Sequence, residues 1–142
     1  MATAYTMSSY HQWDPWKAKQ NTLTITGSFA PASLVVNDTF KFFYIMPGTT
    51  IQHIGFIFPD MDTNVSPLIA LSVGDSSSAT LFISSGTTAQ AGGSTTTAAG
   101  LPKSYSSADY LIMTVSTAPA TAALGAITFL INMSVDSTTN IL

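Results

Sequence analysis

The sequence predicts an all-β fold, an antiparallel β-sandwich or barrel, from three observations. Seven to eight short segments with apolar residues at alternate positions are separated by turn residues. Serine and threonine fill 39 of the 142 positions, and hydroxyl, β-branched and aromatic residues suit a pleated surface. Arginine and glutamate do not occur, and no segment has the period of a long amphipathic helix.

The first three expected strands carry most of the large apolar residues. Residues 21–29 alternate between a threonine face and an apolar face with Leu23, Ile25 and Phe29. Residues 34–46 form the longest candidate. Its two faces carry Phe40, Phe42, Tyr44 and Met46 on one side, and Lys41, Phe43 and Ile45 on the other. Residues 49–58 follow the Pro47-Gly48 turn and become apolar on both faces, as expected of a strand covered on both sides.

Four further apolar segments complete the predicted sandwich. They are residues 68–73, 79–84, 109–116 and 124–135. Gly74-Asp75-Ser76 is expected to be the turn between the first two of them. Residues 85–107 consist mainly of Ala, Gly, Ser and Thr, which predicts a surface loop with one helical turn around residues 87–91.

The first twenty residues differ from the rest of the chain. They hold both tryptophans, Trp13 and Trp16, together with Tyr5 and Tyr10, and they show no sustained period of 2 or 3.6. Tryptophan and tyrosine are frequent anchors at protein interfaces. We therefore expect an extended arm that docks on a neighbour, followed by a sandwich domain over residues 21–142. The alternative is that the tryptophans fold back and close one end of the domain's own core.

Charge is scarce, with four lysines and seven aspartates. The lysines are scattered, so clustered cations for phosphate are missing and no direct nucleic-acid partner is expected. No apolar run is long enough to span a bilayer, and residues 1–12 lack the features of a secretory signal, so we expect assembly in a cytoplasm without a membrane partner. The chain has no cysteine, which excludes disulfide and thiolate chemistry.

Residues capable of catalysis or metal binding are few. His53 has no nucleophile motif of the G-x-S-x-G kind to work with. Asp60 and Asp62 could form a carboxylate pair or open a calcium loop, but Val65 and Leu71 stand where that loop needs a glycine and a carboxylate. We therefore expect an Asx-rich turn at this place, no enzyme activity, no metal and no cofactor.

Aromatic residues cluster in two expected strands that are adjacent in the chain. The cluster comprises Phe40, Phe42, Phe43, Tyr44, Phe56 and Phe58. Core packing is the main role expected for them, while a subunit interface and a platform that stacks on sugars are alternatives for some. We expect Phe43, His53 and Phe56 to be sheet residues that reach a subunit interface.

Sheet and turn patterns between about residues 34 and 135 resemble a known family. The patterns are Leu71-Ser72-Val73-Gly74-Asp75, Phe82-Ile83-Ser84, Leu111-Ile112-Met113-Thr114-Val115, Ala118-Pro119-Ala120-Thr121-Ala122 and Gly125-Ala126-Ile127-Thr128. This series resembles the decoration, or cement, proteins on the heads of tailed bacteriophages. The resemblance implies a jelly-roll sandwich, homotrimers bound to the major capsid protein on the virion exterior, and an arm that ties neighbouring capsomers together.

The sequence thus predicts a structural protein that binds the outer surface of a phage head as a homo-oligomer and stabilises the shell across capsomer seams. Tyr5, Tyr10, Trp13 and Trp16 are the expected contact residues of the arm. The alternative is a receptor- or glycan-binding module of a phage tail or surface spike. In that case the loop of residues 85–107 or exposed aromatic side chains would make the contacts.

Overall fold

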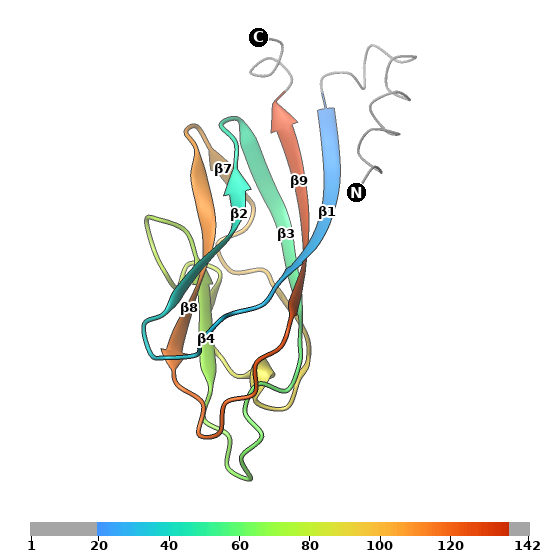
Figure 1. The fold of residues 1–142 in the computed structure, drawn as a ribbon. Helices are drawn as coiled ribbons and strands as arrows, with labels where there is room; N and C mark the ends of the chain where they lie inside the picture. Colours follow the sequence, from blue (N-terminus) through green and yellow to red (C-terminus); the bar gives the residue numbers. More distant parts are fainter. Residues whose placement is uncertain (1–19, 137–142) are drawn as a thin grey trace.

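The computed structural model describes residues 20–136, which form two antiparallel β-sheets that enclose one core (Figure 1). The larger sheet contains, in spatial order, β1 (Gln20–Phe29), β9 (Ile127–Asp136), β3 (Thr49–Phe58) and β6 (Gly93–Thr97), and β7 (Lys103–Tyr105) also pairs with β3. The smaller sheet contains β2 (Thr39–Ile45), β8 (Asp109–Thr117), β4 (Ala70–Gly74) and β5 (Ile83–Gly86). The 3₁₀ turn η2 (Thr88–Gln90) precedes β6. Within residues 20–136, no helix is long and apolar enough to cross a membrane.

The order of the strands is that of a jelly roll. The first four strands alternate between the two sheets along the chain. With the short β7 set aside, the orders β1-β9-β3-β6 and β2-β8-β4-β5 make the two four-stranded layers of an eight-stranded jelly-roll sandwich. The predicted all-β sandwich of jelly-roll type is therefore confirmed. Apart from Gln20, the predicted arm lies outside the described residues.

The core lies between the sheets and is built from their inward side chains. Apolar and polar residues alternate on β8 and β9, so every second side chain points inward. The fully buried residues include Ile45, Ile51, Ile54, Leu111, Met113, Ile127 and Ile131. Phe42 of the smaller sheet packs against rings of the larger sheet, with its centroid 5.1 Å from that of Phe29 and 5.2 Å from that of Phe129.

The bounds of the strands agree with the bounds predicted from the sequence where apolar and polar residues alternate. β3 has the predicted bounds, and β1 and β8 differ from them by one residue at one end. The strand expected over residues 34–46 begins only at Thr39. Before it, Asn37 has a φ of 72°, and Asp38 Oδ2 accepts hydrogen bonds from Ser33 Oγ (2.6 Å) and the Val35 N–H (3.0 Å). This carboxylate closes a turn, which shortens the strand.

A β-bulge changes the predicted faces of β2. Phe42 is an extra residue there, because the residues on either side of it lie opposite successive residues of β8. Beyond the bulge the alternation reverses, so Ile45 is fully buried whereas Tyr44 and Met46 are about half exposed. The expectation that Tyr44 and Met46 share a face with Phe42 is therefore wrong.

Residues 85–107 contain more regular structure than expected. The predicted helical turn is present as η2, but β6 and β7 also lie in this segment, and the prediction of a plain surface loop is wrong. The two strands pair with different halves of β3. β6 has the sequence Gly-Ser-Thr-Thr-Thr, so its extended conformation comes from pairing with β3 and not from an apolar pattern of its own.

Candidate functional site

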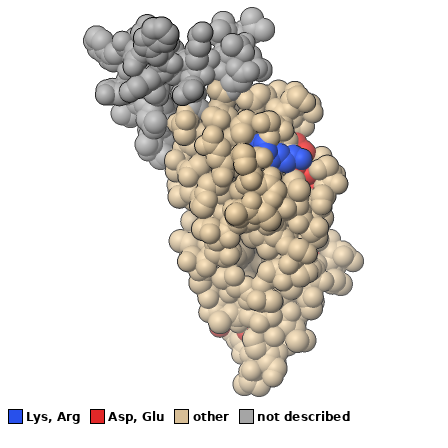
Figure 2. Space-filling view, turned by 180° about the vertical axis from the view of Figure 1, so that it is seen from behind, with Lys and Arg blue, Asp and Glu red and all other residues tan. Residues whose placement is uncertain are grey.

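The outward side chains that the structure describes on β1, β3, β6 and, as far as Ser134, on β9 are uncharged. They are Thr22, Thr24, Thr26 and Ser28 on β1, Thr128, Leu130, Asn132 and Ser134 on β9, Thr50, Gln52, His53, Gly55 and Ile57 on β3, and Ser94 and Thr96 on β6. In the view from behind, charged atoms gather in one spot near the upper edge, with a trace of red near the lower end (Figure 2). A partner on this face would meet hydroxyl groups, amides and apolar atoms.

A groove of about 270 Å³ crosses this face. It follows a row of residues that are Cα partners across four strands: Thr26 on β1, Leu130 on β9, Gly55 on β3 and Thr96 on β6. Gly55 leaves the row open at its centre, because it has no side chain. Ile57, which is 58% exposed, also lines the groove. The groove is therefore an apolar hollow with a hydroxyl rim.

Two residues that line this groove, His53 and Phe56, were expected from the sequence at an interface, and the others were not. His53, an expected interface residue, lines the groove and is half-buried. The signal for the rest was Gly55 itself, a glycine inside the apolar run Ile54-Gly55-Phe56-Ile57, since a glycine within a central strand often marks a close approach by another group.

The rings of the other two predicted sheet residues pack in the core or at its margin. Phe56 is 2% exposed, and its ring lies in the core. Phe43 is half-buried and packs edge-on against Phe129 with ring centroids 6.2 Å apart. Phe56 is therefore a core residue of this sandwich, and Phe43 lies at the margin of the core. The four arm residues Tyr5, Tyr10, Trp13 and Trp16 lie outside the described residues.

One exposed aromatic pair lies on the outward face of the smaller sheet. Tyr44 on β2 and Tyr110 on β8 are Cα partners, with ring centroids 5.3 Å apart and planes at 65°. The residues are 50% and 38% exposed, respectively. Lys41 Nζ lies 5.2 Å from the centre of the Tyr110 ring. This pair is the arrangement closest to the aromatic platform considered from the sequence.

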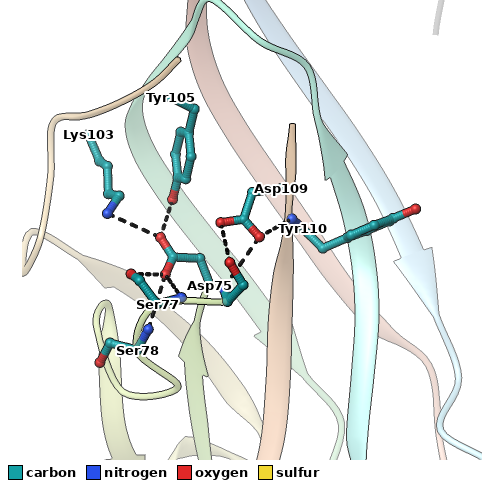
Figure 3. A network of polar contacts seen from close by, with 8 residues as sticks. Asp75, Ser77, Ser78, Lys103, Tyr105, Asp109 and Tyr110 are labelled. Atoms are coloured by element: carbon teal, nitrogen blue, oxygen red, sulfur yellow. Dashed lines mark hydrogen bonds and ion pairs between the residues drawn. The ribbon is translucent and has the colours of Figure 1, made fainter. Parts of the chain in front are cut away.

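Asp75 joins the two sheets at one end of the sandwich (Figure 3). Its Oδ2 accepts a hydrogen bond from the Tyr105 hydroxyl at 2.7 Å and forms an ion pair with Lys103 Nζ at 3.3 Å. Tyr105 and Lys103 both belong to β7 of the larger sheet. Its Oδ1 accepts the N–H groups of Ser77 (2.9 Å) and Ser78 (3.2 Å) in the turn after β4. The expected turn at Gly74-Asp75-Ser76 is therefore also an attachment point between the sheets.

These contacts change the pKa values of the Asp75 carboxyl and the Tyr105 hydroxyl. Burial alone would raise the pKa of Asp75, but the hydrogen bonds from Ser77, Tyr105 and Lys103 outweigh it and lower the pKa to about 2. Burial and the neighbouring Asp75 carboxylate raise the pKa of Tyr105 well above its ordinary value of 10.0. Asp75 is thus a carboxylate, and Tyr105 a phenol, over the whole neutral pH range.

Asp62 has a similar role among the loops at the other end of the sandwich. Its two oxygens accept five backbone N–H groups: those of Leu68 (2.7 Å), Ala120 (2.8 Å), Thr121 (2.9 Å), Ile69 (3.2 Å) and Asn64 (3.3 Å). Burial alone would raise the pKa of Asp62, but the hydrogen bonds from the backbone outweigh this effect. The pKa of Asp62 therefore lies well below its ordinary value. The donors come from residues 64–69 and from 120–121, so Asp62 connects two loops.

The Asx-rich turn expected around Asp60 is confirmed. Asp60 accepts the Asp62 N–H at 3.1 Å, Asp62 accepts that of Asn64, and Asn64 accepts that of Ser66 at 2.9 Å. The oxygens of Asp62 thus bind N–H donors. Among the described residues, no three His or Asp side chains gather where they could hold a metal ion.

The arrangement of the described groups is suited to binding. His53 and Ser94 both line the groove, but its lining includes no carboxylate to orient the imidazole. The buried carboxylates Asp62 and Asp75 are saturated with donors and hold loops together. What the described surface offers is a broad uncharged face, a groove at its centre and an exposed tyrosine pair on the opposite sheet.

No family model matches the sequence, and no curated protein does so. Solved structures similar to this chain are chains of phage capsids. A chain from the structure named "Cyanophage Pam1 capsid asymmetric unit" is 27% identical, with a TM-score of 0.75 over 82% of this chain and 86% of that chain. A chain from "Capsid of Ralstonia phage GP4" is 20% identical, with a TM-score of 0.66 over 82% of this chain and 84% of that chain.

The third similar structure comes from a phage of another host. It is a chain from the acidic stable capsid structure of Helicobacter pylori bacteriophage KHP30, 12% identical, with a TM-score of 0.57 over 80% of this chain and 86% of that chain. At such identities the Ralstonia and Helicobacter phage chains show a shared fold. The chain of the cyanophage Pam1 capsid, at 27% identity, relates this chain to phage capsid proteins.

Proposed function

We propose that this protein is a decoration, or cement, protein that binds the major capsid protein on the outside of a phage head as a homotrimer. The observation that carries the proposal is the 27% identity to a chain of the cyanophage Pam1 capsid over 82% of this chain and 86% of that chain. A similarity that spans nearly the whole of both chains supports a structural role in a virion.

The surface supports attachment to a shell. The larger sheet presents one broad uncharged face, while buried carboxylates hold the loops at both ends. A broad uncharged face suits attachment through apolar contacts and through hydrogen bonds between neutral groups. A homo-oligomer would offer several equal contacts at once, so that modest affinity at each site becomes strong attachment.

Quantitative analysis of particles tests the proposal. We expect purified virions to contain hundreds of copies of this chain, and particles made without it to release DNA at a lower temperature than complete particles. Adding the purified protein to deficient particles should restore the higher temperature. A few dozen copies or fewer, or release at the same temperature with and without the protein, would contradict a cementing role.

The exposed Tyr44–Tyr110 pair favours a second candidate function, a receptor- or glycan-binding module of a tail or spike. Tyrosine rings exposed on a sheet can stack on sugar rings, and Lys41 beside Tyr110 adds a hydrogen-bond donor. If this candidate is correct, the protein binds defined sugars on a glycan array and Tyr110→Ala abolishes that binding. Unchanged binding in Tyr110→Ala, or no bound glycan, would contradict it.

A further inference from the structure

We propose that the groove over Gly55 binds a tryptophan side chain from residues 1–19 of a second copy of this chain. We call residues 1–19 the leader. The inference deepens the proposed homo-oligomer by assigning its contact, and rests on that part of the proposed function. It joins a described groove to the part of the sequence that holds both tryptophans.

Gly55 is a glycine that its own fold does not require. A Cβ atom added there would meet its nearest neighbours, in His53, Thr95 and Thr96, at 3.7 Å, which is ordinary van der Waals contact, and its φ is not in the left-handed region. Each of the other eight glycines, all within the described residues, either has a positive φ or would bring a Cβ atom within 2.8 Å of another atom.

A glycine in the middle of a strand costs about 0.5–1 kcal/mol relative to alanine. Since neither backbone conformation nor crowding in the described fold accounts for Gly55, the space above it points to a group that comes from outside the described sandwich. Glycine within a strand commonly has this role, because it allows another group to approach closely.

The groove suits an indole ring. Leu130 and Ile57 provide apolar walls beside the open position at Gly55, and Thr26 and Thr96 provide hydroxyl groups at its ends. Tryptophan combines a large apolar surface with one N–H donor, which such a rim can accept. The lining includes no Asp or Lys, so a neutral side chain enters without leaving a charge unpaired.

The leader is the segment with the right chemistry and length. Both tryptophans of the chain, Trp13 and Trp16, lie in it, and it ends where β1 begins at Gln20. The groove crosses β1 at Thr26, six residues along the strand, and Gly55 lies two strands further across. At about 3.4 Å per residue along a strand and 4.8 Å between strands, Gly55 is roughly 22 Å from Gln20.

That distance favours the leader of a second copy over the chain's own leader. Trp16 precedes Gln20 by four residues, which span at most about 14 Å. Trp13 precedes it by seven residues, about 24 Å when fully extended, which leaves little chain for the reversal of direction that docking on its own sheet needs. A leader from a neighbouring copy meets no such limit, so exchange of leaders links copies to one another.

Tryptophan fluorescence tests the inference directly, because both tryptophans of this protein lie in the leader. As the concentration of the purified full-length protein rises, we expect the emission maximum to move to shorter wavelength, while light scattering reports a growing mass. Gly55→Val fills the groove and should abolish the wavelength shift. Thr22→Val, a change on the same face outside the groove, should leave it intact.

A second variant guards against a folding defect in Gly55→Val. Ile57→Lys places a charge in the groove wall at an exposed position and should also abolish the shift, with the circular dichroism spectrum unchanged. A shift that persists in both variants would overturn the inference. So would a blue-shifted emission that does not change on dilution in a monomeric protein, since it would place the leader on its own chain.

Disulfide cross-linking identifies the contact, because the natural chain has no cysteine. Chains with Asp14→Cys mixed with chains carrying Thr96→Cys should form a mixed disulfide dimer on mild oxidation. Thr39→Cys, an exposed position on the smaller sheet, replaces Thr96→Cys as the control and should give none. Equal yields from both mixtures would contradict the proposed contact.

These measurements use the isolated protein, so they separate this inference from the proposed function. Attachment to particles without leader exchange would leave the decoration role standing and overturn the inference. Leader exchange in a protein that never attaches to particles would overturn the decoration role and leave the inference standing. If Gly55→Val prevents attachment while the natural protein shows no concentration-dependent shift, the groove binds the shell and the inference is wrong.

Discussion

Tyr105 donates a hydrogen bond of 2.7 Å to Asp75 and so connects the two sheets of the sandwich. Tyr105 ends β7 in the larger sheet, and Asp75 directly follows β4 in the smaller one. The residues are 6% and 3% exposed, so water cannot readily replace either partner. Because Lys103 on β7 also contacts Asp75, two side chains of one short strand hold one carboxylate.

Tyr105→Phe should destabilise the protein. The change removes one hydrogen bond to a buried carboxylate while keeping the ring, and bonds of this kind contribute about 1.5–3 kcal/mol. We expect the free energy of unfolding, measured with urea, to fall by about that amount. Tyr110→Phe removes an exposed hydroxyl and should change it by less than about 0.5 kcal/mol. Equal effects of the two changes would contradict the role given to Asp75.

Stability should decrease in acid. The folded state lowers the pKa of Asp75 from 3.8 to about 2, and it lowers the pKa values of Asp62 and Asp38 as well. A carboxyl with a depressed pKa in the folded state stabilises the fold fully above its unfolded pKa, and this contribution is lost as pH falls through the folded pKa. The unfolding midpoint in urea should therefore be constant between pH 5 and pH 7 and fall from about pH 4 to pH 2.

The variant Asp75→Asn tests how much of this pH dependence comes from one group. It should be less stable than the natural protein at pH 7 and should lose less stability on acidification. A natural protein whose midpoint rises as the pH drops below 4 would mean that these carboxyls are protonated more readily in the folded state than in the unfolded state.

Deletion of residues 1–19 should separate folding from attachment. The sandwich core is complete within residues 20–136, so we expect the shortened protein to keep the circular dichroism spectrum of a β-sheet protein and a cooperative thermal transition. Binding to particles that lack the protein should be lost, because the aromatic arm residues are gone. An unfolded product would instead show that the tryptophans complete the core of their own chain.

Attachment to particles should depend little on salt. Charged residues make up 8% of the chain, and the outward side chains described on β1, β3, β6 and, as far as Ser134, on β9 include none. Salt screens exposed ion pairs but not apolar contacts or hydrogen bonds between neutral groups. The dissociation constant measured by co-sedimentation should therefore change less than about threefold between 0.1 M and 1 M NaCl. Release of the protein in about 1 M NaCl would show that ion pairs hold it in place.

The sequence allowed prediction of those strands whose apolar residues alternate. β1, β3 and β8 were found nearly at their bounds, because alternation is a local property of a strand with one face in the core. β6 and β7 were missed, because a Ser/Thr strand becomes extended by pairing with β3, which is distant in the chain. The bulge at Phe42 was missed for the same reason, since it exists only relative to β8.

The candidate site was less predictable than the fold. His53 was expected at an interface and lines the groove, but the groove arises from a row of partners on four strands, and only register brings them together. Asp75 was recognised as a turn residue, whereas its partner Tyr105 comes from a segment that was expected to be a loop. In both cases the missing information is long-range pairing.

Two glycines of the larger sheet should respond oppositely to the same substitution. A Cβ atom at Gly27 would lie 2.6 Å from Cζ of Phe129, so Gly27→Ala should force that ring to move and cost about 1–3 kcal/mol. At Gly55 the nearest atoms would be 3.7 Å away, so Gly55→Ala should be neutral or raise the free energy of unfolding by about 0.5–1 kcal/mol. Urea denaturation of the two variants at a concentration where the protein is monomeric compares them. Equal losses would mean that Gly55 is a requirement of the sandwich itself, and the space above it would then need no occupant.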